Sequence, residues 1–253
     1  FCADRESSLK MASILKIKNL SYHYDNNDEP VFADINLELE SGEFIAVVGG
    51  SGVGKSTLLR CVANLTAPSN GEIVLYVPHD GARRRRGIVF QDGRLMPWRR
   101  LRGNVAYGLK GLKLSAQEKR ARVDEVLKLT RMQELADRWP HQLSGGQVQR
   151  GGIARALAVE PHLLLMDEPF SAVDAITRRH LQEQLLAIWN ETRKAVMFIT
   201  HDIEEAVYLA DRVIVLAGSP GKIVLDRSIN LSRPRVRNGD ELQQLSNDIA
   251  RYL

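Results

Sequence analysis

The 253-residue sequence is poor in cysteine and has no long apolar run. Its two cysteines, Cys2 and Cys61, lie far apart, so the sequence indicates neither a disulfide framework nor a cysteine metal site. No uninterrupted apolar stretch approaches the about 18 residues that would indicate a transmembrane helix. We therefore expect a chain that does not cross a membrane by itself and that fits a reducing cytoplasm.

A large excess of charge is also lacking, because the formal net charge is only +4. This balance permits an acidic partner such as nucleic acid or anionic lipid without requiring one. The arginine run at 83–86 could contact phosphates, but no aromatic residues are interleaved with it. We favour the interpretation that this run is a solvated connector.

The sequence does not begin with methionine, and residues 1–10 contain no apolar signal-peptide core. We expect residues 1–12 to be a tag remnant or a disordered extension, with Met11 as a plausible natural start. The rest of the chain is long enough for one large α/β domain with a buried core.

Glycine is concentrated where the apolar residues 44–48 lead into the sequence GGSGVGKST at 49–57. The pattern GxxxxGK(S/T) is complete at Gly54, Lys55 and Ser56, and a strand followed by a helix is the context that this pattern requires. Backbone amides of such a loop converge on phosphates, while Lys55 can bridge the β- and γ-phosphates and Ser56 can offer its hydroxyl to magnesium. The stretch predicts a nucleoside triphosphate site; an incidental glycine-rich loop is the weaker interpretation.

A second glycine-containing helix start follows Leu143, at Ser144-Gly145-Gly146-Gln147, and the predicted helix runs to about residue 158. Free backbone amides at a helix N-terminus form a potential phosphate contact. The chain therefore has two such helix ends but only one predicted nucleotide site.

Polar residues stand where predicted core strands end. Asp167 and Glu168 follow the apolar run 163–166, Gln91 follows residues 87–90, and His201 follows residues 195–200. Asp167 can hold magnesium, and Glu168 can polarise the attacking water or accept its proton. Gln91 can sense the metal and water, and His201 can contact the γ-phosphate. The alternatives are acids that merely face solvent and a structural histidine.

Alternating apolar and polar residues at 14–24 and 35–40 predict antiparallel strands joined by the loop 25–30. Tyr24, near the end of the first strand, could stack on an adenine ring or pack at a sheet edge. The other expected elements are a helix over 57–65 stopped by Pro68, a strand at 71–77, a turn at 78–81, a helical insertion over 101–143 with a capping box at Ser115 and Glu118, a helix from Asp174 to about 190, a hairpin at 212–217 and 222–228, and a weak helix at 240–252.

These motifs occur in an order that resembles the nucleotide-binding subunit of an ATP-binding cassette (ABC) transporter over residues 13–235. By this resemblance Glu168 is the catalytic glutamate, His201 the switch histidine and Gln91 the Q-loop glutamine. The resemblance implies ATP contacts from Tyr24, from Gly49, Gly50, Ser51, Gly52, Val53, Gly54, Lys55, Ser56 and Thr57 of the Walker A loop, from Gln91, from Ser144, Gly145, Gly146 and Gln147 of the signature, from Asp167 of the Walker B strand and from Asp174 of the D-loop (171–174). It implies Mg²⁺ contacts from Ser56, Gln91 and Asp167, and roles in catalysis for Lys55, Gln91, Glu168 and His201.

The fold class implied by the resemblance is α/β. It is a P-loop NTPase of the ABC type, with a mixed sheet core, an antiparallel β subdomain and an α-helical subdomain. The implied ATPase domain covers residues 13–235, with its helical part at about 93–160. Residues 236–253 are expected to form a C-terminal tail that is helical.

The resemblance also implies partners. Family members form head-to-tail dimers in which the signature of one subunit completes the nucleotide site of the other, which explains the two phosphate-binding helix ends. We therefore expect ATP, Mg²⁺, a second ATPase subunit, integral membrane permease subunits, and indirect contact with a periplasmic or lipid-anchored solute-binding protein. The expected location is the cytoplasmic face of the bacterial inner membrane, and no nucleic acid is expected.

Finer segments resemble the ATPases of nitrate, sulfonate and taurine importers. They include LMPW at 95–98, NVAYGL at 104–109, THDIEEA at 200–206 and SPGKIV at 219–224. We therefore expect uptake of a small anion of this type. A soluble cassette ATPase acting on nucleic acid or the ribosome, an exporter ATPase, and a P-loop kinase or GTPase are the weaker alternatives.

Four residues, Gly50, Val53, Gly151 and Val173, depart from the family's usual pattern, and none of them removes a catalytic group. Gly151 lies in the predicted signature helix, which it is expected to loosen by up to about 1 kcal/mol relative to a good helix former. Trp98 lies in the loop after Gln91, and we expect it to contact the permease.

Overall fold

The computed structural model describes residues 13–24, 29–78 and 80–253. The expectations for residues 1–12, which include Cys2 and Met11, and for most of the loop 25–30 lie outside the described residues. The elements in chain order are β1 (Ser13–Tyr22), β2 (Phe32–Glu40), β3 (Phe44–Gly49), α1 (Lys55–Val62), β4 (Asn70–Leu75), β5 (Arg86–Val89), α2 (Leu101–Gly108), α3 (Ala116–Leu129), the 3₁₀ turns η1 (Gln133–Leu135) and η2 (Pro140–Gln142), α4 (Gly145–Ala158), β6 (Leu163–Asp167), α5 (Ala175–Thr192), β7 (Ala195–Ile199), α6 (Ile203–Leu209), β8 (Arg212–Ala217), β9 (Lys222–Ser228) and α7 (Asp240–Ala250).

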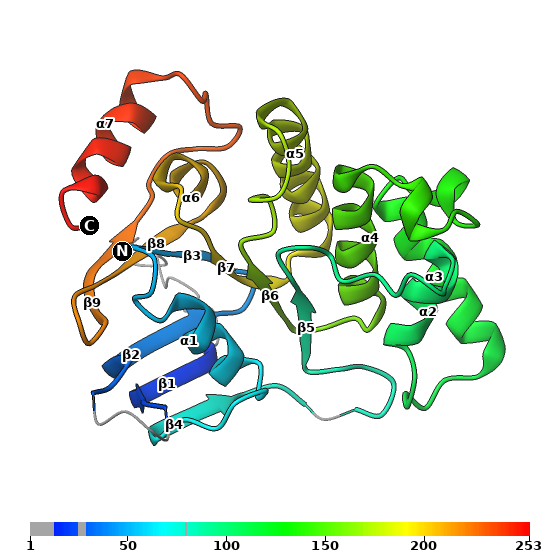
Figure 1. Ribbon diagram of the computed structural model, residues 1–253, viewed down its shortest axis with the longest axis horizontal. Helices are drawn as coiled ribbons and strands as arrows, with labels where there is room; N and C mark the ends of the chain where they lie inside the picture. Colours follow the sequence, from blue (N-terminus) through cyan, green and yellow to red (C-terminus); the bar gives the residue numbers. More distant parts are fainter. Residues whose placement is uncertain (1–12, 25–28, 79) are drawn as a thin grey trace, which may run out of the picture.

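A small antiparallel sheet has the strand order β2-β1-β4 and forms the blue-to-cyan part of Figure 1. The end of β2 alternates between buried Leu37 and Leu39 and exposed Asn36 and Glu38, because one face of the sheet packs on the core and the other faces water. The antiparallel pairing predicted for the first two strands is confirmed.

The central sheet has the strand order β5-β6-β7-β3-β8-β9. Its strands are parallel except for β9, which pairs antiparallel with β8 as the predicted hairpin. Parallel strands present their carboxyl ends at one edge of a sheet, where ligands bind in open α/β folds. The mixed sheet therefore places the phosphate loop, Gln91, Asp167 and His201 at the same edge.

Strand β3 separates two hydrophobic cores. Phe44, Ala46 and Val48 point into a core shared with the helices, whereas Ile45 and Val47 point into a core shared with α1 and the small sheet. All six residues of β3 are buried, which explains its continuous apolar sequence.

Helices α2, α3 and α4 form a lobe beside the sheet, shown in green on the right of Figure 1. The capping box predicted at Ser115 is confirmed, because its hydroxyl accepts from Glu118 N and the Glu118 carboxylate accepts from Ser115 N. Helix α7 packs against α6 and buries Leu242 and Ile249 in the helical core, so residues 236–253 are not a detached tail. Within the described ranges, no helix combines the length and apolarity needed to cross a bilayer.

Two helices differ from expectation. Helix α1 ends at Val62, before residue 65, because Asn64 adopts a left-handed conformation with φ 60° just after the helix; Pro68 is not the residue that stops it. Helix α6 was not predicted as an element, because its seven residues are too few to show a helical period and most of them are buried.

Gly151 does more than loosen α4. A Cβ at this position would lie 2.8 Å from Leu101 Cδ1 and 3.0 Å from Leu95 Cδ1. The missing side chain therefore allows α4 to approach α2 closely, which the sequence expectation did not include.

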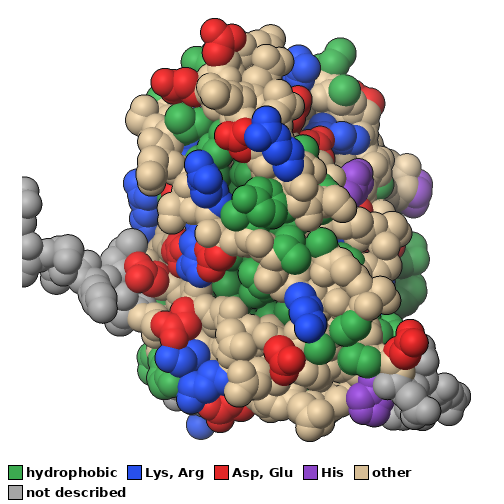
Figure 2. All heavy atoms as spheres, turned by 90° about the vertical axis from the view of Figure 1, so that its left-hand side faces the viewer, with side chains coloured by type: hydrophobic (Ala, Val, Ile, Leu, Met, Phe, Trp, Pro, Cys, Tyr) green, Lys and Arg blue, Asp and Glu red, His purple; other side chains and the backbone are tan. Residues whose placement is uncertain are grey.

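The arginine run leads into β5, and Arg83 and Arg84 are exposed as expected of a solvated connector. Its side chains are also bonded: Arg83 Nε lies 3.0 Å from Glu160 Oε2, Arg84 Nη2 donates to Lys110 O at 2.9 Å, and Arg85 donates to Leu75 O. Arg83 and Arg84 thereby contact the segments that follow α4 and α2, and Arg85 contacts the end of β4. Figure 2 shows another face, at the left of Figure 1, where Lys and Arg side chains are interspersed with Asp and Glu around a central apolar group.

Candidate active site

The phosphate loop between β3 and α1 has the conformation that its glycines predict. Gly54 is the N-cap of α1 with φ 102°, and no side chain caps this helix. A Cβ at Gly54 would lie 3.0 Å from the side chains of Phe32 and Val31, so both the backbone angle and the available space favour glycine. The amides at the start of α1 are therefore left for a ligand.

Lys55 lies inside this loop. Its Nζ donates to Gly49 O at 2.8 Å and to Gly50 O at 2.9 Å, and the residue is only 6% exposed. Burial lowers the pKa of Lys55, and the charges of Glu168 and Asp167 oppose that shift. The two carbonyl groups that accept from the ammonium group are neutral. A bound anion would therefore supply the opposite charge that these carbonyl groups do not provide.

The ends of β6 and β7 join the loop. Ser56 Oγ donates to Asp167 Oδ1 at 2.8 Å, and Asp167 pairs with Ile199 across the two strands. Glu168 N donates to Ile199 O at 3.0 Å, while Glu168 has φ 43°, which is uncommon for a residue other than glycine. His201 Nδ1 lies 3.1 Å from Glu168 Oε2. The catalytic pair predicted from sequence is therefore in contact.

A cleft of about 430 Å³ lies between these groups, and we call it the phosphate-loop cleft. It is lined by Tyr24, Val31, Ser51, Gly52, Gly54, Lys55, Ser56, Thr57, Glu168 and His201. Tyr24 is 51% exposed, and its ring contacts Tyr22 edge-on at 5.2 Å between centroids. The other predicted Walker A residues, Gly49, Gly50 and Val53, belong to the same stretch but do not line the cleft, and Val53 is buried.

The signature residues do not line the phosphate-loop cleft. Ser144 Oγ accepts from Gln147 N at 3.3 Å, and Gln147 Oε1 accepts from Ser144 N at 2.9 Å, so the two residues form a capping box at the start of α4. Ser144 and Gly145 are exposed, whereas Gly146 is buried where a Cβ would lie 2.6 Å from Thr177 Cγ2 of α5. This helix start is therefore not part of the cleft of its own chain.

Three other predicted site residues, Gln91, Asp167 and Asp174, also do not line that cleft, although Asp167 accepts from Ser56, which does. Gln91 is exposed in the loop after β5. Asp174 is the N-cap of α5, where its Oδ1 accepts from Ile176 N at 3.1 Å and from Thr177 N at 3.0 Å. The hydrogen bond from Thr177 is the largest cause of a lowered Asp174 pKa. Asp174 therefore has a structural role that the sequence also predicted.

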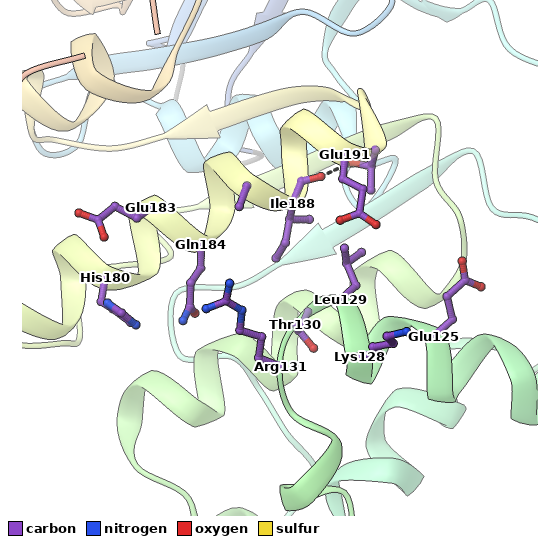
Figure 3. A pocket seen from close by; sticks show the side chains of 12 residues that line it. Glu125, Lys128, Leu129, Thr130, Arg131, His180, Glu183, Gln184, Ile188 and Glu191 are labelled. Carbon is purple, nitrogen blue, oxygen red and sulfur yellow. Dashed lines mark hydrogen bonds between the residues drawn. The ribbon is translucent and has the colours of Figure 1, made fainter. Parts of the chain in front are cut away.

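A larger hollow of about 750 Å³ lies between the end of α3 and α5, with Arg131 and Gln184 facing each other across it (Figure 3). Its lining mixes acids and bases, such as Glu125, Lys128 and Glu191. None of the predicted site residues lines it. Size alone therefore does not identify the active site.

Sequence reasoning missed residues that surround the catalytic pair. A small pocket next to Glu168 and His201 is lined also by Arg178 and Glu205. Arg178 Nη2 donates to Val173 O at 3.3 Å, and Arg178 Nη1 lies 3.9 Å from Asp202 Oδ2. The signal for Glu205 is a carboxylate within the apolar segment of α6, but its partners are distant in sequence.

The matches to known proteins agree with this geometry. A profile of the ABC transporter family matches residues 32–171, which is more than half of the chain. The chain belongs to the ABC transporter family. Two curated ABC relatives cover nearly all of it. A taurine import ATP-binding protein of Pseudomonas putida is 44% identical over 94% of this chain and 91% of its own length, and an uncharacterized ABC transporter ATP-binding protein of Methanocaldococcus jannaschii is 42% identical over 96% and 92%.

Solved ABC structures have the same fold. The post-hydrolysis dimer of the ATP-binding cassette MJ0796, bound to ADP and Pi, has a TM-score of 0.72 at 32% identity, and covers 86% of this chain and all of that one. The protein cbiO1 of Clostridium perfringens, described as part of the ABC transporter complex cbiONQ, has a TM-score of 0.75 at 33% identity over 86% of this chain and 89% of that one. This ABC chain is therefore an ATPase whose ATP hydrolysis is coupled to transport.

Proposed function

We propose that this chain energises an importer of taurine or a related sulfonate, with nitrate-type anions as the nearest alternative. The observation that carries the ATPase part is one cleft lined by Lys55, Ser56, Glu168 and His201, next to which Asp167 accepts a hydrogen bond from Ser56. The taurine import relative, at 44% identity over 94% of the chain, supports the solute class.

The phosphate-loop cleft would hold ATP. The Walker A residues and Lys55 would bind the β- and γ-phosphates, because uncapped amides and a buried ammonium converge there. Tyr24 would stack on the adenine, since its exposed ring stands at the rim and is supported by Tyr22.

Mg²⁺ fits the oxygen donors at this site. The Ser56 hydroxyl lines the cleft and lies 2.8 Å from the Asp167 carboxylate, and magnesium prefers such hard oxygen ligands. These two residues would hold the ion against the phosphates, and Gln91 would reach it from its exposed loop. When bound, Mg²⁺ would neutralise charge on the phosphate oxygens.

Glu168 would polarise the attacking water or accept its proton, and His201 would contact the γ-phosphate. The 3.1 Å contact between the two side chains supports a paired role. Because Glu168 is held by main-chain contacts to β7 and to Ser171, its carboxylate is positioned before any nucleotide arrives.

A second ATPase subunit would complete the site. Ser144, Gly145, Gly146 and Gln147 are outside the cleft of their own chain, which supports a contact with the γ-phosphate held by the partner. Asp174, at the end of the D-loop, would lie near that interface. Ser144 can still donate its hydroxyl proton, because in the capping box its oxygen only accepts.

Permease subunits would dock near the loop after Gln91, and a solute-binding protein would act indirectly through them. Trp98 is 71% exposed, which supports its predicted role as a permease anchor and removes the alternative that it packs inside the helical lobe. Such a complex would place the chain on the cytoplasmic face of the inner membrane. We also propose the division into an ATPase domain at 13–235, with a helical part at about 93–160.

The solute class is tested by complementation. A bacterial strain that lacks its own taurine import ATP-binding subunit is given this chain, or its Glu168→Gln variant as the control, and is grown with taurine as the sole sulfur source. We expect growth only with the unmodified chain. No growth with a chain that hydrolyses ATP and associates with the permease would contradict the taurine assignment.

A further inference from the structure

The loop that carries His201 rests on a buried carboxylate. Glu205 of α6 is 6% exposed, and desolvation by burial raises its pKa. Its carboxylate accepts hydrogen bonds from the Thr200 side chain and from Gln182 Nε2, the latter at 2.6 Å. Asp202 N donates to Thr200 Oγ1 at 3.0 Å, so both neighbours of His201 belong to this polar cluster.

Hydrogen bonds of the neighbouring residues hold the backbone around His201, while the His201 side chain is exposed to solvent. The His201 side chain is 60% exposed and contacts the Glu168 carboxylate. Asp202 Oδ1 also accepts from Glu205 N at 3.0 Å and caps α6. The position of His201 relative to Glu168 therefore depends on Thr200, Asp202 and Glu205.

The C-terminal segment reaches the same cluster through one amide. Arg237 Nη1 donates to Gln182 Oε1 at 2.6 Å, and Gln182 is only 2% exposed. An arginine can only donate and a carboxylate can only accept, so Arg237 and Glu205 together fix which way the Gln182 amide points. Arg237 is itself held by Tyr208, whose ring centroid lies 3.6 Å from its guanidinium carbon.

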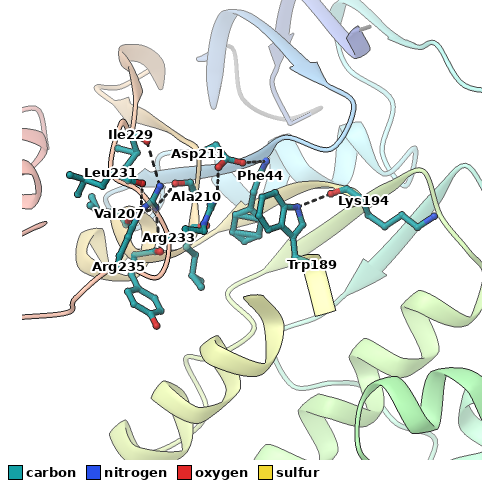
Figure 4. A network of polar contacts seen from close by, with 12 residues as sticks. Phe44, Trp189, Lys194, Val207, Ala210, Asp211, Ile229, Leu231, Arg233 and Arg235 are labelled. Atoms are coloured by element: carbon teal, nitrogen blue, oxygen red, sulfur yellow. Dashed lines mark hydrogen bonds and ion pairs between the residues drawn. The ribbon is translucent and has the colours of Figure 1, made fainter. Parts of the chain in front are cut away.

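The segment before Arg237 is bonded to α6 and to the two residues between α6 and β8 (Figure 4). The Arg235 guanidinium is buried and donates to Val207 O and Ala210 O, each at 2.6 Å. Arg233 pairs with Asp211 and stacks on Trp189 at 4.5 Å from the ring centroid. These contacts of Arg233 and Arg235 place the chain so that Arg237 reaches Gln182.

We propose that Arg237 is a positioning residue for ATP hydrolysis. Through Gln182 it orients the Glu205 carboxylate, which holds the backbone around His201 at the distance that lets the histidine meet Glu168 and the γ-phosphate. The C-terminal segment is in this way a structural part of the hydrolytic site. This inference rests on the proposed roles of His201 and Glu168.

The test is Arg237→Met in the full chain, because methionine keeps an apolar stem on Tyr208 but cannot donate to Gln182. We expect kcat for ATP hydrolysis to fall about tenfold with KM for ATP unchanged, within the about 100-fold that a misplacement of 1 Å can cost. Arg251→Ala is the matched control, since that arginine is in the same C-terminal region but its side chain is 78% exposed and pairs with Asp248 at the surface. It is expected to keep the full kcat.

The His201→Ala background separates positioning from general damage. If Arg237 acts through His201, Arg237→Met lowers kcat no further in that background. Arg237→Lys, which keeps one charged donor, is expected to recover part of the loss, and it also serves if the methionine variant does not fold. An equal fall in both backgrounds, an unchanged kcat in the folded variant, or a change in KM alone would overturn the proposal. Failure of the underlying roles has a different result, namely wild-type turnover by Glu168→Gln.

Discussion

The starts of α1 and α4 are both helix N-termini whose N-cap is a glycine or a serine, yet the two are capped differently. At α1 the N-cap is Gly54, and no side chain caps the backbone amides. The buried Lys55 donates hydrogen bonds to two carbonyl oxygens of the loop. At α4 the N-cap Ser144 is already satisfied by Gln147 and stays exposed. The first end leaves its amides uncapped beside its own cleft, whereas the second is capped by its own side chains and lies outside that cleft.

The largest expected effects distinguish the role of Lys55, at the start of α1, from that of the neighbouring Glu168. Lys55→Ala removes the buried charge, so ATP affinity should fall about 10- to 100-fold. Glu168→Gln should still bind Mg-ATP and accumulate as a nucleotide-bound dimer, while its turnover falls about 10²- to 10⁴-fold. Equilibrium nucleotide binding and steady-state hydrolysis measure the two effects. Wild-type turnover by Glu168→Gln would remove that residue from the chemistry.

Ser144→Arg tests the second helix end. The added bulk and charge should lower hydrolysis at least about 100-fold, which is the typical cost of losing one donor to a developing charge. Nucleotide affinity of the isolated chain should change little, because Ser144 does not line the phosphate-loop cleft. The dimer interpretation fails if this variant loses monomer affinity as severely as Lys55→Ala.

Trp98→Ala tests the loop that joins the sheet to the helical lobe. Because Trp98 is 71% exposed, its truncation should change the free energy of unfolding by no more than about 0.5 kcal/mol. Association with the permease should weaken about 30-fold, which corresponds to a loss of about 2 kcal/mol at an aromatic anchor. Thermal melting and permease co-purification give the two readings. Normal transport by the stable variant would exclude the anchor role.

Gly151→Ala has the smallest expected effect and tests how α4 is placed. Helix propensity favours alanine by about 1 kcal/mol, but contacts at 2.8 and 3.0 Å with Leu101 and Leu95 should cost about 1 to 3 kcal/mol, so we expect net destabilisation. Gly103→Ala in α2 is the control, because its Cβ would meet only Arg99 Cβ at 3.6 Å. Denaturant unfolding should move the two variants in opposite directions.

Sequence predicted most clearly what is local. The phosphate loop, the strand ends and the Ser115 capping box each depend on residues within a few positions of one another, and all are formed. One rule of parallel sheets predicted that the residues after β6 and β7 lie at the same sheet edge, and the contact between Glu168 and His201 is a further result of the structure.

Sequence could not predict contacts made by packing. Gln182 meets Glu205 and Arg237 only because α5, α6 and the C-terminal segment converge, and no spacing in the chain encodes that meeting. The end of α1 was misplaced because Asn64 can adopt positive φ, which competes with the stronger-looking signal of Pro68. The role of Gly151 depends on how closely two helices approach.

The two-sided burial of β3 limits where the chain can gain or lose a residue. Inserting one residue before Val48 would exchange the side chains that face the two cores, because successive residues of a strand point to opposite faces. It would also advance Gly49 by about 3.3 Å along the strand, away from the position where its carbonyl receives Lys55. Length, as well as composition, is therefore fixed in this segment, and a single-residue deletion there should be more damaging than most substitutions.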